Sequence, residues 1–108
     1  MSYKIFTIPP FDKQLKRLVR KYPSLKKEFP IFVNSIIENP KQGDGVGNDC
    51  YKIRLAISSK GKGKSGGARV ILHIAIADSI VYLIAIYDKS EKGTIENKEL
   101  LDLLKYID

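Results

Sequence analysis

The sequence predicts an α+β fold with the element order β-α-α-β-β-β-α, in which a helical hairpin packs on one face of a small sheet. Two apolar stripes at helical spacing come first, followed by three apolar runs rich in β-branched residues. These runs cover residues 51–57, 68–76 and 80–87. The 108 residues, 44% of them hydrophobic, suffice for one core, so we expect a single domain over residues 1–108.

The chain is predicted to begin with a strand at Tyr3–Ile8, which Pro9 and Pro10 close. A helix follows over residues 11–22, and its apolar stripe predicts which side faces the core. That stripe consists of Phe11, Leu15, Leu18, Val19 and Tyr22. The other face of this helix is basic and carries Lys13, Lys16, Arg17, Arg20 and Lys21.

A second helix is predicted over residues 24–39, with Ser24 as its N-terminal cap. Its apolar positions are Leu25, Phe29, Phe32, Val33, Ile36 and Ile37. Pro30 falls inside this pattern, where it removes a backbone donor and crowds the preceding turn, so we expect a kink or a split helix. The short Pro23–Ser24 connection predicts that the two helices form an antiparallel hairpin.

In the second half of the sequence, turn-rich segments alternate with apolar segments. Residues 39–49, NPKQGDGVGND, predict a loop, and Ala77–Ser79 suits a tight hairpin between the last two apolar runs. Residues 94–107 predict a closing helix because their apolar residues fall on one side. These residues are Leu100, Leu101, Leu104 and Ile107.

The stretch SSKGKGKSGGARVI, residues 58–71, carries three lysines among its glycines. It is not a P-loop, because Ser58 stands where that motif needs glycine and a β-branched strand, not a helix, follows. We interpret it as a cationic hairpin loop whose Lys60, Lys62 and Lys64 contact a phosphate backbone. A solvated, flexible tip is the alternative.

Charge and cysteine content narrow the function classes. The net charge of +7, with a pI near 9.5, favours a polyanionic partner, first of all nucleic acid. The single cysteine excludes an internal disulfide, and no Cys/His cluster has the spacing of a metal site, so neither a metal nor a cofactor is expected. Without a signal peptide or an apolar run long enough to span a membrane, we expect a cytoplasmic protein with no membrane partner.

Strand alternation predicts a cationic face on the sheet. Ile53, Leu55 and Ile57 must face the core, which leaves Lys52 and Arg54 on the other side. In the next two runs the residues expected on that side are Arg69, Ile71, His73, Ala75, Leu83, Ala85 and Tyr87. We therefore predict an uncovered groove where cations and Tyr87 converge, with His73 as a structural residue. Neutralisation by Asp78 or Asp88, at the strand ends, is the alternative.

At these residues the chain resembles the RelE/ParE superfamily of bacterial toxins, especially the RelE- and HigB-like messenger-RNA endoribonucleases. The strings that carry the resemblance are DCYKIRL at 49–55, GKGKSGGARVI at 61–71 and IYDKSEK at 86–92. The resemblance implies two N-terminal helices against a twisted antiparallel sheet. It also implies cleavage of mRNA in the ribosomal A site, neutralisation by a cognate antitoxin, and a monomer or a toxin–antitoxin hetero-oligomer.

The resemblance also implies site residues. The paired cations of the RelE-type strand fall on Lys52 and Arg54, the following arginine on Arg69, and a basic residue after the last strand on Lys89. The family's C-terminal tyrosine falls on Ile95, and Tyr87 is similar to the tyrosine of the HigB-like branch. We assign Lys52, Arg54, Arg69, Tyr87 and Lys89 to catalysis.

Further cations are predicted to hold RNA outside the catalytic group. Lys60, Lys62, Lys64 and Lys92 are expected to anchor the RNA backbone. The basic face of the first helix is interpreted as a solvated surface, with contact to ribosomal RNA as the alternative.

Two other functions remain open at this point. A ParE-like gyrase inhibitor would share the fold and act by protein binding without nuclease activity. An inactive RNA-binding or antitoxin-docking module is the third possibility.

Overall fold

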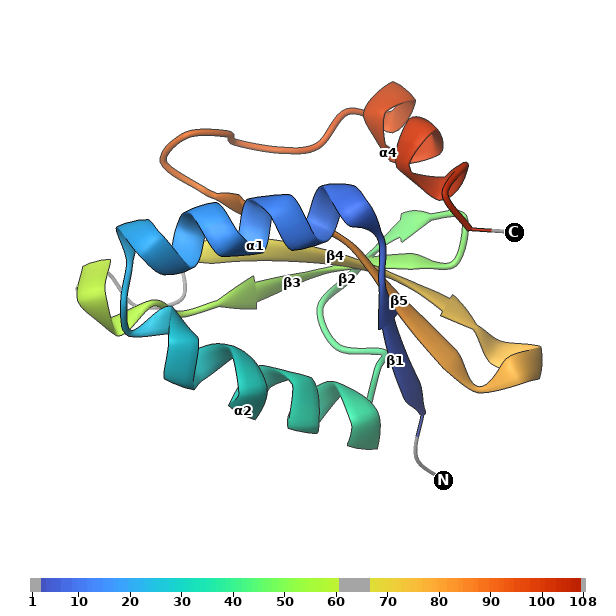
Figure 1. Ribbon diagram of the computed structural model, residues 1–108. Coiled ribbons are helices and arrows are strands. Elements are labelled where there is room, and N and C mark those ends of the chain that lie inside the picture. The colour runs from blue at the N-terminus through green and yellow to red at the C-terminus, as the bar shows by residue number, and fades with distance from the viewer. Residues whose placement is uncertain (1–2, 61–66, 108) are drawn as a thin grey trace.

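The computed structural model describes residues 3–60 and 67–107 of the chain. Its elements are β1 (Lys4–Thr7), α1 (Pro9–Lys21), α2 (Leu25–Glu38), β2 (Asp44–Gly47), β3 (Cys50–Leu55), β4 (Ala68–Ala75), β5 (Ile80–Asp88) and α4 (Asn97–Leu104). Short 3-10 turns lie at Ser58–Lys60 and Ile76–Asp78. The predicted α+β order is confirmed, with β2 as an additional strand (Figure 1).

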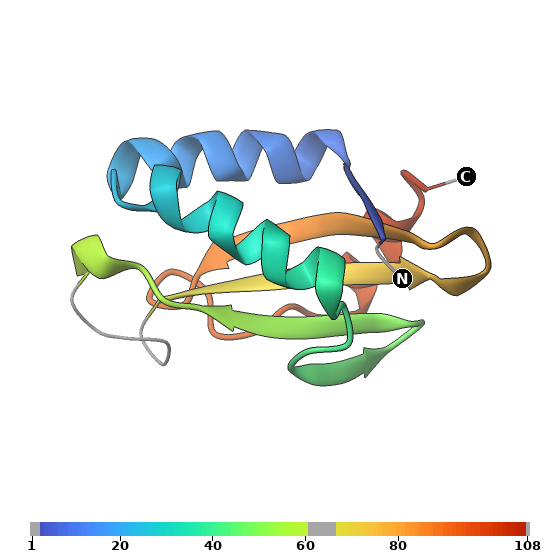
Figure 2. The same cartoon turned by 90° about the horizontal axis from the view of Figure 1, so that it is seen from below.

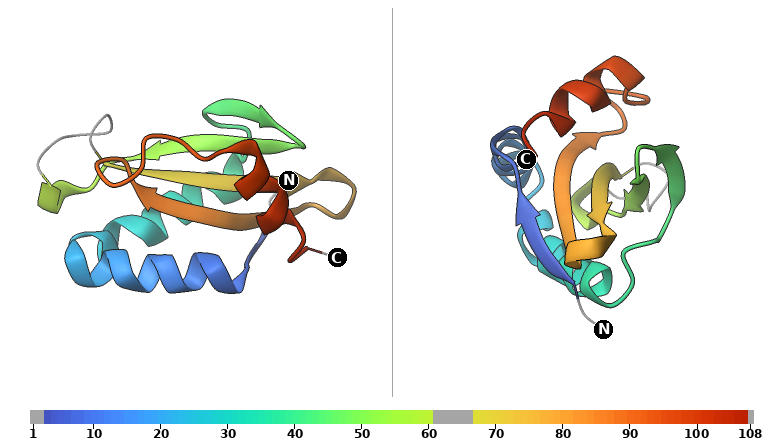
Figure 3. Two further views of the ribbon diagram at one scale, coloured as in Figure 1. Left: turned by 90° about the horizontal axis from the view of Figure 1, so that it is seen from above. Right: turned by 90° about the vertical axis from the view of Figure 1, so that its right-hand side faces the viewer.

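The five strands form one sheet in the order β1-β5-β4-β3-β2. The pairs β5–β4 and β4–β3 are antiparallel, as predicted, and the additional pair β3–β2 is antiparallel too. Because β1 runs parallel to β5, the sheet is mixed. Helices α1 and α2 lie side by side on one face of this sheet (Figure 2). Helix α4 lies on the other side of α1 from α2 and is reached through a long connection after β5 (Figures 1 and 3).

Helix α1 begins at Pro9, two residues before its predicted start. Proline is well suited to the first positions of a helix, because the N–H groups there have no intrahelical acceptor. Phe11 and Leu18 of its apolar stripe are fully buried, and the predicted core side is confirmed.

Helix α2 runs without a break from Leu25 to Glu38, so the expected split at Pro30 is wrong. Pro30 lies on the exposed side, and the carbonyl that loses its donor belongs to Lys26, which is exposed and therefore accessible to solvent. The expected cap by Ser24 is wrong too. The Ser24 hydroxyl donates to Glu28 Oε1 at 2.8 Å instead of accepting a helix N–H.

The segment predicted as a loop contains β2, a short edge strand paired with β3. The turn between them has two consecutive left-handed residues, Asn48 and Asp49, with φ of 56° and 58°. That geometry fits a hairpin turn of type I′, which favours Asn and Asp. Gly43, before β2, has φ of 77°, and a Cβ there would lie 2.2 Å from the Lys52 carbonyl oxygen.

A β-bulge in β5 changes the predicted faces. Ile71 pairs with Ala85, but the next residue, Leu72, pairs with Leu83, so Ile84 is an extra residue. Leu83 therefore lies on the opposite face from Ala85 and is 1% exposed. Its predicted place beside Ala85 and Tyr87 is wrong, because strict alternation does not continue through a bulge.

One glycine of the glycine-lysine stretch, Gly67, is required by the close packing of β3 and β4. A Cβ at this position would lie 2.1 Å from the Leu55 carbonyl oxygen, so only glycine allows β3 and β4 to approach here. We expect Gly67→Ala to lower the free energy of unfolding by about 1–3 kcal/mol, measured by urea denaturation. Gly93→Ala is the matched control, since a Cβ there meets no atom within 4 Å. Equal losses for the two variants would contradict this explanation.

Candidate active site

The predicted catalytic cations lie on one face of the sheet, in adjacent strands. Arg54 of β3 is directly opposite Arg69 of β4, and Arg69 is directly opposite Tyr87 of β5. Lys52, two residues before Arg54, points to the same side and faces Ile71. The cross-strand row Arg54–Arg69–Tyr87, with Lys52 beside it, thus has the order that strand alternation predicted.

The row is exposed at one end and covered at the other. Arg54 is exposed and Lys52 is partly exposed, but Arg69 is only 4% exposed and Tyr87 only 8%. The Arg69 guanidinium donates to the Ala68 carbonyl oxygen at 3.1 Å. The prediction of an uncovered groove is therefore wrong at the β4–β5 end.

The C-terminal segment contacts the Tyr87 end of the row. The Lys92 ammonium lies 5.8 Å from the centroid of the Tyr87 ring and forms an ion pair with Glu99 of α4. Leu100 of α4 is buried against the core. Lys92, predicted to anchor RNA, is thus held between the Tyr87 ring and α4 in this conformation.

The Tyr87 hydroxyl is buried at the covered end of the row. Burial raises the pKa of its hydroxyl, and Arg69 and the Ile95 amide oppose this shift only in part. The buried hydroxyl makes no hydrogen bond with the described residues, and the Ile95 amide is near enough only to lower its pKa. A buried hydroxyl without a partner is costly, which is typical of a group kept for a substrate.

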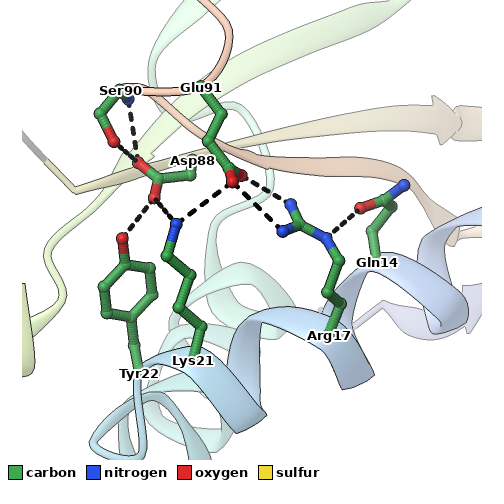
Figure 4. A network of polar contacts seen from close by, with 7 residues as sticks. All are labelled: Gln14, Arg17, Lys21, Tyr22, Asp88, Ser90 and Glu91. Carbon is green, nitrogen blue, oxygen red and sulfur yellow. Dashed lines mark hydrogen bonds and ion pairs between the residues drawn. The ribbon is translucent and has the colours of Figure 1, made fainter.

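Lys89 follows β5 in a turn that a buried carboxylate holds in place. Asp88 is 0% exposed and accepts hydrogen bonds from Tyr22 Oη at 2.6 Å, Ser90 N at 2.9 Å and Ser90 Oγ at 2.7 Å. The Lys21 ammonium is 3.8 Å from the same carboxylate (Figure 4). The Lys89 side chain is exposed at the outside of this turn.

Glu91 extends the same network towards α1. It accepts from the Arg17 guanidinium at 2.6 Å and from Lys21 at 3.2 Å, and Arg17 also donates to Gln14 (Figure 4). This network was not predicted from the sequence, because its members lie about 70 positions apart along the chain. The acidic residues after β5 were its only signal.

The predicted RNA anchors in the glycine-lysine stretch cannot be placed as a group. Lys62 and Lys64 lie outside the described residues, and Lys60 ends the 3-10 turn Ser58–Lys60. The start of this turn is tied to α2, because Glu28 accepts from Ser58 N at 2.8 Å and from Ser58 Oγ at 2.6 Å.

Glu28 predicts a pH dependence of stability. Burial acts to raise its pKa, but the hydrogen bonds from Ser58 and Ser24 outweigh this and lower the pKa below the ordinary 4.5. The resulting stabilisation is complete above the unfolded-state pKa and is lost as the pH falls through the lower folded-state value. We expect Glu28→Gln to be less stable than the wild type at pH 7 and the gap to close below about pH 4.5. Denaturation at several pH values measures this gap; Glu38→Gln, at an exposed position, should show none.

His73 has the structural role that was predicted for it. Its Nδ1 lies 2.9 Å from the Asn48 carbonyl oxygen, so this nitrogen carries the proton and donates. Cys50 Sγ is 3.6 Å from the same nitrogen, and burial raises the pKa of the thiol to about 11, which keeps it protonated. Within residues 3–60 and 67–107 no group of three or more His, Cys, Asp or Glu side chains is arranged to hold a metal ion.

A cavity of about 830 Å³ opens beside the site, between α1, β5 and α4. Tyr87 and Lys92 line it from the side of the site, and Lys13 and Arg17 from α1. β1 pairs only with Ile80–Leu83 of β5, so the rest of that strand borders the cavity without a neighbouring strand on this side. None of the helices in the described part of the chain is long and apolar enough to cross a membrane.

Comparison with known proteins identifies the family and the fold. The family model described as the RelE toxin of the RelE/RelB toxin–antitoxin system matches residues 5–107. Two solved structures share the fold. One is a free-state arginine-to-alanine double mutant of the E. coli toxin RelE, with 17% identity, a TM-score of 0.66 and complete coverage of both chains. The other is the isolated E. coli RelE toxin, with 17% identity, a TM-score of 0.62 and coverage of 99% of this chain and 100% of the other. Because the family model covers nearly the whole sequence, this chain belongs to the RelE toxin family.

Proposed function

We propose that this toxin is an endoribonuclease that cleaves messenger RNA on the ribosome without a metal cofactor and thereby inhibits translation. The observation that carries the proposal is the row Arg54–Arg69–Tyr87 with Lys52 on the same face. Two guanidinium groups at facing positions offer planar, bidentate donors that fit the oxygens of a phosphodiester. A neighbouring ammonium and a phenol supply the other groups that the reaction needs.

The proposed reaction is an in-line attack of the RNA's own 2′-OH on the adjacent phosphorus. The bond from phosphorus to the 5′ oxygen breaks, leaving a 2′,3′-cyclic phosphate on one fragment and a 5′-OH on the other. This step needs a group that takes or polarises the 2′ proton, cations for the pentacoordinate phosphate, and a proton for the leaving oxygen.

The site residues divide these tasks. Arg54 and Arg69 hold and neutralise the phosphate. Lys52 takes the 2′ proton as a neutral amine, or polarises the 2′-OH as an ammonium so that water takes that proton. Lys89, exposed on its turn, stabilises the charge that develops on the leaving oxygen. Because burial raises the pKa of Tyr87, its hydroxyl stays protonated at neutral pH. Tyr87 is therefore better suited to stack on a base or to donate a proton than to act as general base.

RNA reaches Arg69 and Tyr87 only after the cover over them shifts. The contacts that hold the cover at Tyr87 are the ion pair of Lys92 with Glu99 and the position of Lys92 over the ring. An RNA phosphate can replace Glu99 as the partner of Lys92, which would turn this lysine into the backbone anchor proposed for it.

The partners follow from the same proposal. The substrate is mRNA in the ribosomal A site, and the protein is held inactive by a cognate antitoxin, free as a monomer or bound in a hetero-oligomer. The description of the matching family as one half of a RelE/RelB system supports the antitoxin. The gyrase-inhibitor alternative is not proposed, since the family match is to RelE.

The test is to add the purified protein to translating ribosomes in the presence of a chelator and to map the mRNA ends. We expect new 5′-OH ends within codons at the A site, and 2′,3′-cyclic phosphate on the upstream fragments. Intact mRNA, with a folded protein and with translation unaffected, would overturn the proposal. A supercoiling assay with DNA gyrase is the second arm, in which no inhibition is expected.

A further inference from the structure

The outer face of α1 carries an unusual density of positive charge. Five cations occur within residues 13–21, and all of them are exposed. They surround a hollow of about 590 Å³. The residues that line it are Lys13, Gln14, Lys16, Arg17, Arg20 and Lys21.

Only part of this charge is neutralised by the protein itself. Glu91 pairs with Arg17 and Lys21. The ion pairs among the described residues do not include Lys13, Lys16 or Arg20. The acidic residue Asp12 lies in the first turn of α1. Like charges three and four residues apart on a helix repel each other, so an external polyanion would relieve this face.

The hollow adjoins the cavity that lies beside the candidate active site. Lys13, Gln14 and Arg17 line both this hollow and the 830 Å³ cavity that Tyr87 and Lys92 border. The cavity also contains Tyr106, an aromatic side chain that is 56% exposed. Glu91 and Glu99 also line the cavity, and both are paired with cations. An exposed aromatic ring beside cations suits single-stranded nucleic acid, whose bases stack while charge holds the backbone.

We propose that these two hollows form one track for the single-stranded RNA that flanks the segment held at Arg54, Arg69 and Tyr87. From Lys13 to Arg20 the helix rises by about 10 Å, enough for more than one nucleotide. A flexible single strand can bend from the site across the edge of β5 and onto α1, whereas a stiff duplex cannot. The track rests on the proposed function in that the occupant is the same RNA strand.

The experiment uses RNA oligonucleotides with 2′-O-methyl groups, because blocking the 2′-OH prevents cleavage and leaves binding measurable. One oligonucleotide has about 5 nucleotides and fills the site alone, and the other has about 14 and reaches past it; a single module of this kind contacts about 4–16. The variant K13Q/K16Q/R20Q is compared with the wild type. The control variant is K26Q/K27Q/K41Q, which removes three exposed lysines that line neither hollow.

We expect K13Q/K16Q/R20Q to bind the long oligonucleotide roughly tenfold or more weakly at low salt, with the short one unchanged. For the long oligonucleotide, the slope of the logarithm of the binding constant against the logarithm of the salt concentration should become less steep by about 2. This is the change expected when three phosphate contacts to a single strand are lost. The control variant should bind both as the wild type does. Thermal melting of each variant checks the fold.

Other outcomes would overturn the track. They are equal losses for both oligonucleotides, the same loss in the control variant, or unchanged binding of the long oligonucleotide. If K13Q/K16Q/R20Q binds both oligonucleotides normally but no longer binds to ribosomes, α1 docks on ribosomal RNA and the proposed track is wrong. Failure of mRNA cleavage with intact length-dependent binding would count against the nuclease and leave the track standing, so the two proposals can fail separately.

Discussion

Arg69→Ala is expected to reduce mRNA cleavage by about 100- to 1000-fold, which corresponds to roughly 3–4 kcal/mol of transition-state stabilisation. Arg69 is the central member of its row, since Arg54 faces it on one side and Tyr87 on the other. Its loss removes a bidentate donor from the phosphate where negative charge develops. Primer extension on mRNA in a translating extract, with the amount of protein varied, measures the change in rate.

The controls separate chemistry from folding, because Arg69 is buried. Arg69→Lys keeps the charge but loses the planar pair of donors, so it should recover only part of the rate. Circular dichroism and a thermal melt establish that each variant is folded. A folded Arg69→Ala protein that cuts mRNA at the wild-type rate would remove this site from consideration.

Asp88→Ala is expected to lower the free energy of unfolding by about 3 kcal/mol or more. The variant leaves Tyr22 Oη, Ser90 N and the nearby Lys21 ammonium without the buried carboxylate that they now share. Buried polar groups that lose a charged partner are far more costly than exposed ones. Urea denaturation at pH 7 gives the value directly.

Glu91→Ala is the matched control for this prediction. Glu91 belongs to the same network but is exposed, and exposed ion pairs contribute only about 0.2–1 kcal/mol. Tyr22→Phe removes one hydrogen bond to Asp88 and should fall between the two. If Asp88→Ala costs no more than Glu91→Ala, the carboxylate does not hold the turn that carries Lys89.

The shared face of Lys52, Arg54 and Arg69 could be predicted from the sequence, because side chains alternate regularly along β3 and β4. What alternation could not provide is the bulge at Ile84, since nothing in an apolar run marks an extra residue. Leu83 was misplaced for that reason. The strand β2 was missed because its glycines are typical of loops, and an edge strand needs little apolar character of its own.

The cover over Arg69 and Tyr87 was missed for a different reason. Burial of a strand face depends on which distant segment packs on it, and Leu100 and Lys92 give no local sign of their target. The sequence pattern of α4, with one apolar side, predicts a helix that packs on something but not on which face of the sheet. The network of Asp88 and Glu91 is equally non-local.

The parallel pairing of β1 with β5 has a consequence for the order of events during synthesis. Lys4 pairs with Ile80, so the first strand waits for a partner made 76 residues later. At a translation rate of about 5–20 residues per second, that wait is roughly 4–15 s. Such long-range pairing also slows folding after release, because much of the chain must be ordered before the contact is gained. The row of Arg54, Arg69 and Tyr87 is therefore complete only after β5, which carries Tyr87 and pairs with β1, has been synthesised.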